Sequence, residues 1–192
     1  MGEADARERK GNAVLTERLR LRPLRAREMI ALAKLATNEA VQPHLTIALA
    51  PAAMAGHETF AIERRADRAL LGACGYSPLP AAGTVEFALW VSDGAWGCGY
   101  GTEAAHALVD RAFQNEAVTE VWASVRVTNV RGRRVLEKCG FQARGTGMAR
   151  AGHGAFPVER FMLSRRAWAS LKAWGATVTG RLNADGSRQS VA

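Results

Sequence analysis

Residues 96–104 read WGCGYGTEA, with glycines at the alternating positions Gly97, Gly99 and Gly101. Glycine has no Cβ and accepts positive φ, so this stretch can bend tightly and leave its backbone amides open. The apolar spacing of a helix follows over residues 102–115, and the positive end of that helix would point back at the turn. The stretch is therefore predicted to be a strand-to-helix turn whose amides converge on an anion such as a diphosphate.

Glycine-rich turns also occur in two well-known phosphate-binding motifs, which fit this sequence less well. A P-loop needs a Lys after its last glycine, and here Thr102 follows Gly101. A dinucleotide fingerprint, G-x-G-x-x-A, fits residues 99–104, and Glu120 follows at about the expected distance of 20 residues. That fingerprint belongs to parallel βαβ units, whereas the strands expected before this turn form hairpins, so topology counts against it. A simple connection whose glycines only relieve strain also stays open.

Hydrophobic patterning on both sides of the turn predicts a mixed sheet. Strands expected in succession before the turn, with short connections, indicate an antiparallel meander, and the helix after the turn returns the chain to a parallel strand. The stretch 41–56 is ambiguous, with a helix expected near Pro51. The strands are expected at residues 15–24 (ended by Pro23), 59–65, 69–77, 84–92, 118–125, 141–148 and 156–164, and the other helices at 25–37, 102–115, 129–139 and 165–174.

The fold class that follows is a single α/β domain with a mixed, mostly antiparallel sheet and helices on both faces. The chain has 192 residues, of which 48% are apolar, enough for one sizeable core. The domain is placed at residues 14–174. Residues 1–13 and the small, polar tail at 175–192 are expected to be disordered.

The charge balance favours anionic partners. Lys and Arg number 26 against 18 Asp and Glu, which gives a net charge of +8. The basic residues are interspersed with acids rather than gathered in blocks, which argues against a nucleic-acid-binding arm, and an ordinary enzyme from an arginine-rich proteome is the plainer explanation. No apolar run is long enough to span a membrane, and the N-terminus lacks a secretory signal. A cytoplasmic location without a membrane partner is therefore expected.

The cysteines and histidines give little sign of metal or disulfide chemistry. Cys74, Cys98 and Cys139 lie far apart, without a C-x-x-C pair. The four histidines share no short spacing, so each is expected to be a surface or packing residue. Three free thiols and no metal site are predicted.

Four stretches carry a family resemblance. Residues 15–23 (LTERLRLRP), 85–91 (VEFALWV), 96–104 and 129–141 (NVRGRRVLEKCGF) occur in this order along the chain. Together they resemble the GNAT superfamily of acyl-CoA-dependent N-acyltransferases, and within it the subgroup that acetylates the N-terminal alanine or serine of ribosomal proteins. The resemblance covers about residues 14–165.

This resemblance implies a GNAT-type sheet and an acetyltransferase that uses acetyl-CoA as co-substrate, as a monomer or homodimer. The acceptor that it implies is a protein N-terminal α-amino group. A small-molecule amine or an aminoglycoside stays as an alternative acceptor, and a non-catalytic acyl-CoA-binding module stays as an alternative function. The acyl-CoA contacts that it implies are made by Leu89, Trp90, Val91, Trp96, Gly97, Cys98, Gly99, Tyr100, Gly101, Thr102 and Asn129.

Glu86 is the candidate general base. In its strand, Val85 and Phe87 begin an apolar face, so Glu86 and Trp90 lie on the opposite one. A carboxylate on a half-open face suits a substrate cleft, where it could accept a proton from the amine directly or through water. The alternative is that Glu86 only pairs with an Arg on a solvated face. Because no Cys or Ser stands beside a plausible base, direct transfer is favoured over a covalent intermediate.

Asn129 and Thr102 each have a structural alternative to a functional role. Asn129 stands where a helix N-cap belongs, and the resemblance adds a catalytic role through a polar contact with the pantetheine arm or the acceptor. Thr102 could cap its helix or offer its hydroxyl to phosphate. Trp96 and Tyr100 could pack under the loop instead of touching the cofactor. The resemblance also implies a backbone N–H near residues 89–91 as the oxyanion donor.

The chain departs from the family at Gly132. A Ser stands there in the family and is the proposed proton donor to the departing thiolate. Arg131 or Arg133 could stabilise a thiolate but not donate a proton readily, and Cys139 and Tyr100 are other conceivable donors. A thiol with a pKa of about 8.5 is also a tolerable leaving group without help.

Overall fold

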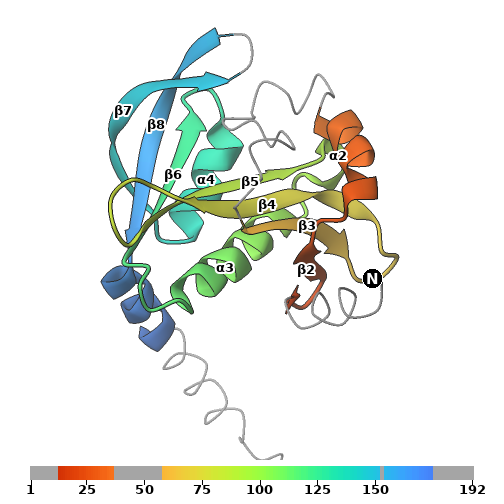
Figure 1. Ribbon diagram of the computed structural model, residues 1–192, viewed down its shortest axis with the longest axis horizontal. Helices are drawn as coiled ribbons and strands as arrows, with labels where there is room; N and C mark the ends of the chain where they lie inside the picture. Colours follow the sequence, from red (N-terminus) through yellow and green to blue (C-terminus); the bar gives the residue numbers. More distant parts are fainter. Residues whose placement is uncertain (1–12, 37–57, 152–153, 175–192) are drawn as a thin grey trace, which may run out of the picture.

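The computed structural model describes residues 13–36, 58–151 and 154–174. In these residues an eight-stranded sheet in the order β1-β2-β3-β4-β5-β6-β8-β7 forms the centre of the molecule (Figure 1). The strands are β1 (Val14–Leu15), β2 (Leu19–Pro23), β3 (Glu58–Arg64), β4 (Leu70–Pro78), β5 (Thr84–Val91), β6 (Glu120–Arg126), β7 (Gln142–Ala151) and β8 (Gly154–Ser164). The helices are η1 (Ala26–Glu28), α2 (Met29–Ala36), η4 (Asp93–Ala95), α3 (Tyr100–Phe113), α4 (Val130–Lys138) and a last helix at residues 165–174.

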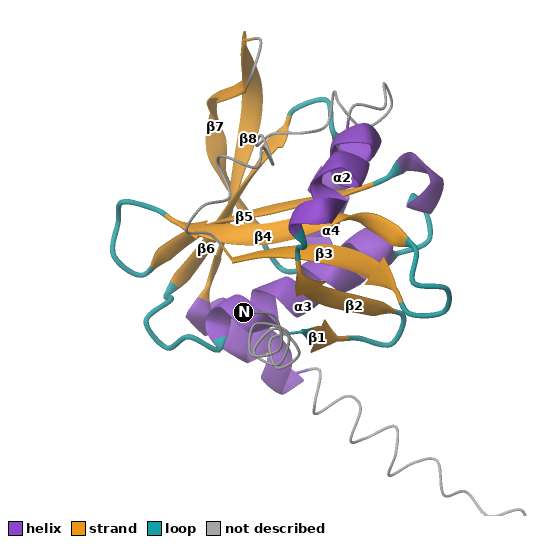
Figure 2. Ribbon diagram, turned by 45° about the vertical axis from the view of Figure 1, so that its right-hand side comes forward, coloured by secondary structure: helices purple, strands orange, loops and turns teal. Residues whose placement is uncertain are grey.

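The strand pairing confirms the predicted mixed sheet. Strands β2 to β5 form an antiparallel meander, and β6, β8 and β7 also pair antiparallel. The exception is the pair of β5 and β6, which run parallel because α3 carries the chain back along the sheet. β7 and β8 form a long hairpin that projects from the rest of the molecule (Figures 1 and 2).

The expected strand at 15–24 is instead a tight hairpin, so that prediction is corrected. β1 pairs back on β2, and Thr16 closes the turn between them. The backbone N–H of Thr16 donates to the carbonyl of Leu19 at 3.0 Å, and the backbone N–H of Leu19 donates to the Thr16 hydroxyl oxygen at 2.9 Å. Pro23 ends β2 as expected. The local hydrogen bonds of Thr16 therefore override the apolar–basic alternation that suggested one continuous strand.

Helices cover both faces of the sheet, as predicted. α3 and α4 lie over one face and α2 over the other (Figure 2). The larger core, beneath α3, includes Val85 and Phe87 of β5. On the opposite face, Leu32 of α2 packs with Trp90. β5 thus alternates as expected, and Glu86 lies on the α2 face.

The feature that positions the site is the separation of the two parallel strands. β5 and β6 are paired only as far as Phe87 and Ala123. Both continue beyond that point, β5 to Val91 and β6 to Arg126. A small cavity lies where they part, lined by residues of both strands and of α4. The sheet therefore opens into a gap at its centre, called the β5–β6 gap below.

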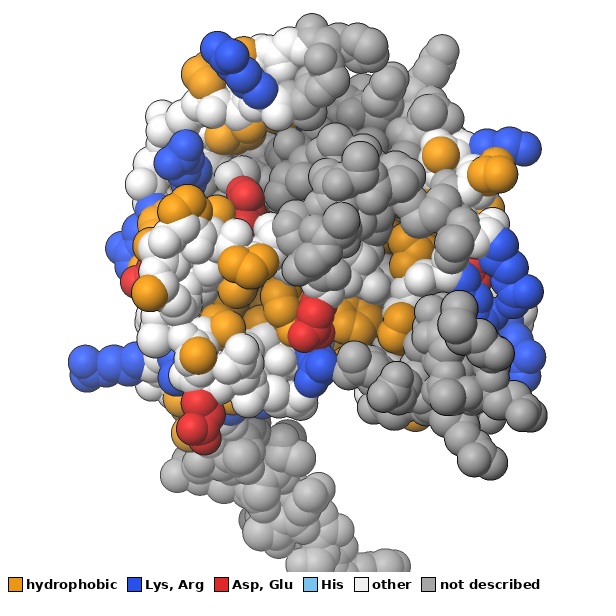
Figure 3. All heavy atoms as spheres, in the orientation of Figure 1, with side chains coloured by type: hydrophobic (Ala, Val, Ile, Leu, Met, Phe, Trp, Pro, Cys, Tyr) orange, Lys and Arg blue, Asp and Glu red, His pale blue; other side chains and the backbone are white. Residues whose placement is uncertain are grey.

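Some predictions fall outside the described residues. Apart from Ala13, this holds for the disorder expected at 1–13 and 175–192, and for the helix expected near Pro51. In the described residues no helix is long and apolar enough to cross a membrane. Within the same ranges, no cluster of three or more potential metal-ligating side chains occurs. On the face shown in Figure 3, Lys and Arg side chains lie mostly around the outline, and acidic side chains occur both at the edge and nearer the middle.

Candidate active site

A cleft of about 340 Å³ lies between the end of β5, the glycine-rich loop and α4. It is lined by nine of the eleven residues predicted to contact the cofactor. Cys98 and Tyr100 are not among its lining residues. The nine are Leu89, Trp90, Val91, Trp96, Gly97, Gly99, Gly101, Thr102 and Asn129.

The glycine-rich loop has the backbone geometry of an anion cradle. Gly97 and Gly99 have φ of +76° and +80°, in the left-handed region that favours glycine. Gly99 is the N-cap of α3 and offers no side-chain cap, so the first amides of the helix are not capped from within it. α3 begins at Tyr100, two residues earlier than predicted, so Thr102 lies in its first turn and is not its cap. The loop and the helix dipole both present positive potential to the cleft.

The β1–β2 turn is bonded to the glycine-rich loop and to α3. Thr16 and Arg18 of this turn bind Glu103, an arrangement called the latch below. Glu103, in the first turn of α3, accepts hydrogen bonds from the Thr16 hydroxyl (2.5 Å), the Arg18 backbone N–H (2.8 Å) and the Arg18 Nε (2.7 Å). The Arg18 guanidinium also donates to the carbonyl of Cys98 at 2.8 Å and lies 4.7 Å from the centre of the Tyr100 ring. Partial burial works against the charge of Glu103, but these hydrogen bonds hold its pKa below the ordinary value. The opening motif and the glycine-rich motif, far apart in sequence, are thus joined.

Trp96 connects three walls of the cleft. Its Nε1 donates to the carbonyl of Val91 at 2.8 Å, and the guanidinium of Arg131 lies 5.0 Å from the centre of the indole ring. Trp96 also packs against the core beneath α3. The side chain therefore both lines the cleft and supports the loop, so the two predicted roles coexist.

The backbone of β5 directs an N–H group into the β5–β6 gap. The Ser92 N–H donates to the carbonyl of Leu71 in β4 at 2.7 Å. Backbone groups alternate sides along a strand, so the N–H groups of Leu89 and Val91 point away from β4 and toward the gap. The indole of Trp96 reaching the Val91 carbonyl from that side agrees with this orientation. Leu89 lies just past the last β5–β6 pair, where the ladder no longer continues.

Asn129 is the N-cap of α4, as predicted. Packing around position 132 accounts for the glycine that replaces the family's serine. The Asn129 Oδ1 accepts from the Gly132 N–H at 2.8 Å. A Cβ at position 132 would lie 2.8 Å from both the Asn129 Nδ2 and the Val125 Cγ2. A side chain there would therefore shift the side chain of Asn129, which caps α4, or that of Val125, so the present packing leaves no room for the family's hydroxyl. Cys139 is buried, which raises the pKa of its thiol to about 12, and it does not line the cleft.

Three basic side chains along α4 line the cleft. Arg131, Arg134 and Lys138 are spaced three and four residues apart, which places them on one face of the helix. Arg133 points elsewhere and forms an ion pair with Glu159 of β8. Arg134 and Lys138 were not predicted from the sequence. Their spacing of three and seven residues from Arg131 could have indicated a basic face on this helix.

Glu86 lies half-buried beside the β5–β6 gap, on the α2 face. The Ser124 hydroxyl of β6 donates to its Oε1 at 3.2 Å. Among the described residues, no Lys or Arg forms an ion pair with Glu86, so the alternative of an Arg partner finds no support there. His106 is the histidine that the structure describes; it lies on α3 and does not line the cleft.

Comparisons with known proteins agree with this geometry. A protein-family model described as "Acetyltransferase (GNAT) domain" matches residues 18–142. A GNAT acetyltransferase of Bacillus anthracis shares the fold with a TM-score of 0.68, at 17% identity over 79% of this chain and 98% of that one. RimJ of Mycobacterium smegmatis, solved with CoA-disulfide, gives 0.67, at 20% identity over 82% and 89%. The aminoglycoside acetyltransferase AAC(6')-Ib, solved with coenzyme A, gives 0.64, at 18% identity over 80% and 99%. A search of curated protein sequences found no significant match.

Proposed function

Because the chain belongs to the GNAT acetyltransferase family and is thus an acyltransferase that uses CoA, we propose that it transfers the acetyl group of acetyl-CoA directly to the α-amino group of a protein N-terminus. The main observation behind this proposal is that the cofactor cleft, the β5–β6 gap and the candidate base lie next to one another. The cleft beside the glycine cradle and the small cavity of the β5–β6 gap adjoin, since Leu89, Asn129 and Gly132 line both. Glu86 accepts a hydrogen bond from Ser124 beside the gap. The resemblance of residues 15–23 and 96–104 to N-terminal acetyltransferases supports the choice of acceptor. The catalytic domain is assigned to residues 14–174.

The phosphates of CoA bind at the helix end of the cleft. The amides of residues 99–102 and the dipole of α3 receive the diphosphate. Arg134 and Lys138 lie farther along α4 than Gly132, and they supply positive charge for the remaining phosphate. The pantetheine arm then runs past Asn129 toward Leu89.

The carbonyl of the thioester lies against the end of β5. As it becomes tetrahedral, its oxygen gains negative charge, and the backbone N–H of Leu89 donates to it. This donor is fixed by the β4–β5 ladder before the reaction, so no reorganisation is needed at the moment of transfer. The amine approaches from the α2 face, on the side of Glu86.

Glu86 takes the proton of the amine, directly or through one water. An α-amino group has a pKa of about 7.7–8.0, so a large fraction is neutral near pH 8. Deprotonation by the base therefore costs little free energy. The amine nitrogen attacks the carbonyl carbon, the C–N bond forms and the C–S bond breaks. The proton leaves on Glu86, and Ser124 keeps the carboxylate oriented toward the gap.

The thiolate leaves without a side-chain acid at position 132. A thiol with a pKa of about 8.5 is an acceptable leaving group, and Arg131 adds positive charge near the cleft. Asn129 caps α4 through its Oδ1 and contacts the pantetheine through its NH₂ group. Its catalytic contribution is therefore to position the cofactor.

Two assays test the proposal in sequence. Thermal-shift titration is expected to show stabilisation by acetyl-CoA and CoA but not by NAD or NADP. Stabilisation by NAD alone would support the dinucleotide alternative. Thiol release is then measured with peptides that carry free N-termini, with small amines and with an aminoglycoside, and peptides are expected to be acetylated. Tight CoA binding with no acetylated amine would instead indicate a non-catalytic acyl-CoA-binding module.

A further inference from the structure

Two buried donor atoms without a partner belong to β5 and β6, the strands that border the β5–β6 gap. They are the Nε1 of Trp90 and the Nε of Arg126, and neither has a hydrogen-bond partner among the residues that the structure describes. Buried polar atoms in proteins are nearly always paired, so such an exception calls for an explanation. A substrate that carries hydrogen-bond acceptors would supply the missing partners when it binds in the gap.

The strand register places these two donors at the same level, one on β5 and one on β6. Glu86 of β5 is paired with Trp122 of β6. Trp90 and Arg126 each lie four residues beyond that pair, one on each strand, where the strands have separated. Side chains two residues apart share a face, so both donors lie on the same face as Glu86. The base thus lies where the strands part, and the two donors lie on opposite sides of the opening.

Both side chains are held before any ligand binds. Trp90 is only 6% exposed and packs against Leu32 of α2. The guanidinium of Arg126 stacks on Phe156 of β8, with its Cζ 3.5 Å from the ring centre. Packing therefore holds both side chains on the separated ends of β5 and β6, with their donor atoms unpaired.

The chemistry of this opening suits an acceptor that carries oxygen atoms next to its amine. Trp90 and Arg126 only donate hydrogen bonds, and Arg126 is also cationic. The neighbouring carboxylates accept hydrogen bonds from neutral donors, Glu86 from Ser124 and Glu120 from Trp122. The cationic Arg126 and the net charge of +8 both repel a polycationic amine.

We infer that Trp90 and Arg126 form an acceptor subsite that selects peptide N-termini with a carboxylate in the first few residues, and that it rejects polycationic amines. This inference rests on the proposed transfer to a protein N-terminus. Trp90 donates to a peptide carbonyl, and Arg126 binds the carboxylate. The amine then lies between them, facing Glu86.

The test compares two peptides with the same N-terminal residue, Ala-Asp-Glu and Ala-Lys-Lys, each extended by the same neutral sequence, together with kanamycin. Wild-type enzyme is expected to favour the acidic peptide in kcat/KM by roughly tenfold or more, the factor of one charge-assisted hydrogen bond. Arg126→Met should remove this preference by raising KM for the acidic peptide alone. Trp90→Phe deletes the N–H but keeps a ring, and it should raise KM for both peptides. Arg126→Met should leave KM for acetyl-CoA unchanged, because Arg126 is not among the residues that line the cofactor cleft.

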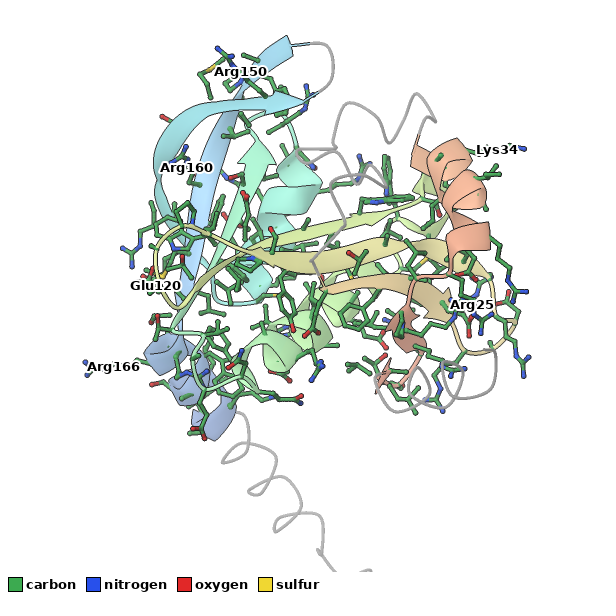
Figure 4. The ribbon with its side chains drawn as sticks, in the orientation of Figure 1. Arg25, Lys34, Glu120, Arg150, Arg160 and Arg166 are labelled. Atoms are coloured by element: carbon green, nitrogen blue, oxygen red, sulfur yellow. The ribbon has the colours of Figure 1, made fainter. Side chains whose placement is uncertain are left out.

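Arg150→Met is the matched control. Arg150 of β7 is exposed and pairs with Ala155 near the end of the β7–β8 hairpin (Figure 4), so its replacement is expected to leave the peptide preference intact. If Arg126→Met does not fold, Arg126→Gln keeps hydrogen-bonding capacity without charge and gives the same answer. Equal use of both peptides by the wild type, or an unchanged preference in the Arg126 variants, overturns the inference while the proposed function stands. Acetylation of kanamycin but of no peptide overturns both.

Discussion

Substitution of Gly132 tests whether the site is built as described, because a nearby glycine provides a matched control. Gly132 and Gly101 both lie in the first turn of a helix that borders the cleft. A Cβ at 132 would lie 2.8 Å from Val125 and from Asn129. A Cβ at 101 would meet Val135 at 3.7 Å, an ordinary contact. Alanine at the two positions should therefore have opposite effects on stability.

The magnitudes follow from three opposing effects. Replacing glycine by alanine inside a helix gains roughly 0.5–1 kcal/mol, and Gly101→Ala should show that gain. At position 132 the same gain is offset by overpacking, which costs about 1–3 kcal/mol. Displacing the Asn129 cap costs about another 1 kcal/mol. The net expectation for Gly132→Ala is a loss of about 2 kcal/mol, which corresponds to a fall in Tm of roughly 4–8 °C for a chain of this size.

The assay is urea unfolding of the wild type, Gly132→Ala, Gly132→Ser and Gly101→Ala, with thiol release measured on the same samples. Gly132→Ser restores the family's hydroxyl but should be destabilised like the alanine variant and no more active than the wild type. Gly101→Ala should be stable, with a raised KM for acetyl-CoA because the new methyl group faces the cleft. A stable, more active Gly132→Ser would refute the packing argument and the claim that the thiolate leaves without an acid at this position.

Further variants test the base, the phosphate contacts and the latch. Glu86→Gln should lower kcat/KM by about 10²–10⁴-fold, with KM for acetyl-CoA unchanged, and full activity across pH 6–9 would show that the base is elsewhere. Arg134→Ala with Lys138→Ala should weaken CoA binding more than dephospho-CoA binding and flatten its salt dependence, and equal losses for both ligands would contradict the phosphate assignment. Because the pKa of Glu103 is lowered in the folded state, its contribution to stability is present above its ordinary value of 4.5 and is lost as pH falls through the folded-state value. Glu103→Gln should therefore lower Tm more at pH 7 than at pH 3, and a Tm loss equal at both pH values would argue against the latch.

The strands and their faces were predictable because they depend on local patterns. The alternation in residues 84–92 assigned Glu86 and Trp90 to one face, and the structure confirms it. The assignment of Asn129 as an N-cap was equally local, and it is confirmed. Patterns that repeat over two or four residues carry this information within a short window.

The remaining features depend on contacts between distant residues. The turn at Thr16 is stabilised partly by Glu103, 87 residues away, so the hydrophobic pattern of 15–24 could not reveal it. The crowding at Gly132 arises from Val125 on another strand. The unpaired state of Trp90 and Arg126 likewise depends on what α2 and β8 place around them. Such features need coordinates, since no spacing in the sequence encodes them.

A crystal structure of the CoA complex would show whether the glycine-rich loop and the β5–β6 gap together hold the cofactor. We expect the diphosphate within hydrogen-bonding distance of the backbone amides of residues 99–102, and the sulfur in the β5–β6 gap, between Leu89 and Asn129. Diphosphate bound away from this loop, or a sulfur directed out of the gap and away from Glu86, would mean that the cleft is not the site of acetyl transfer.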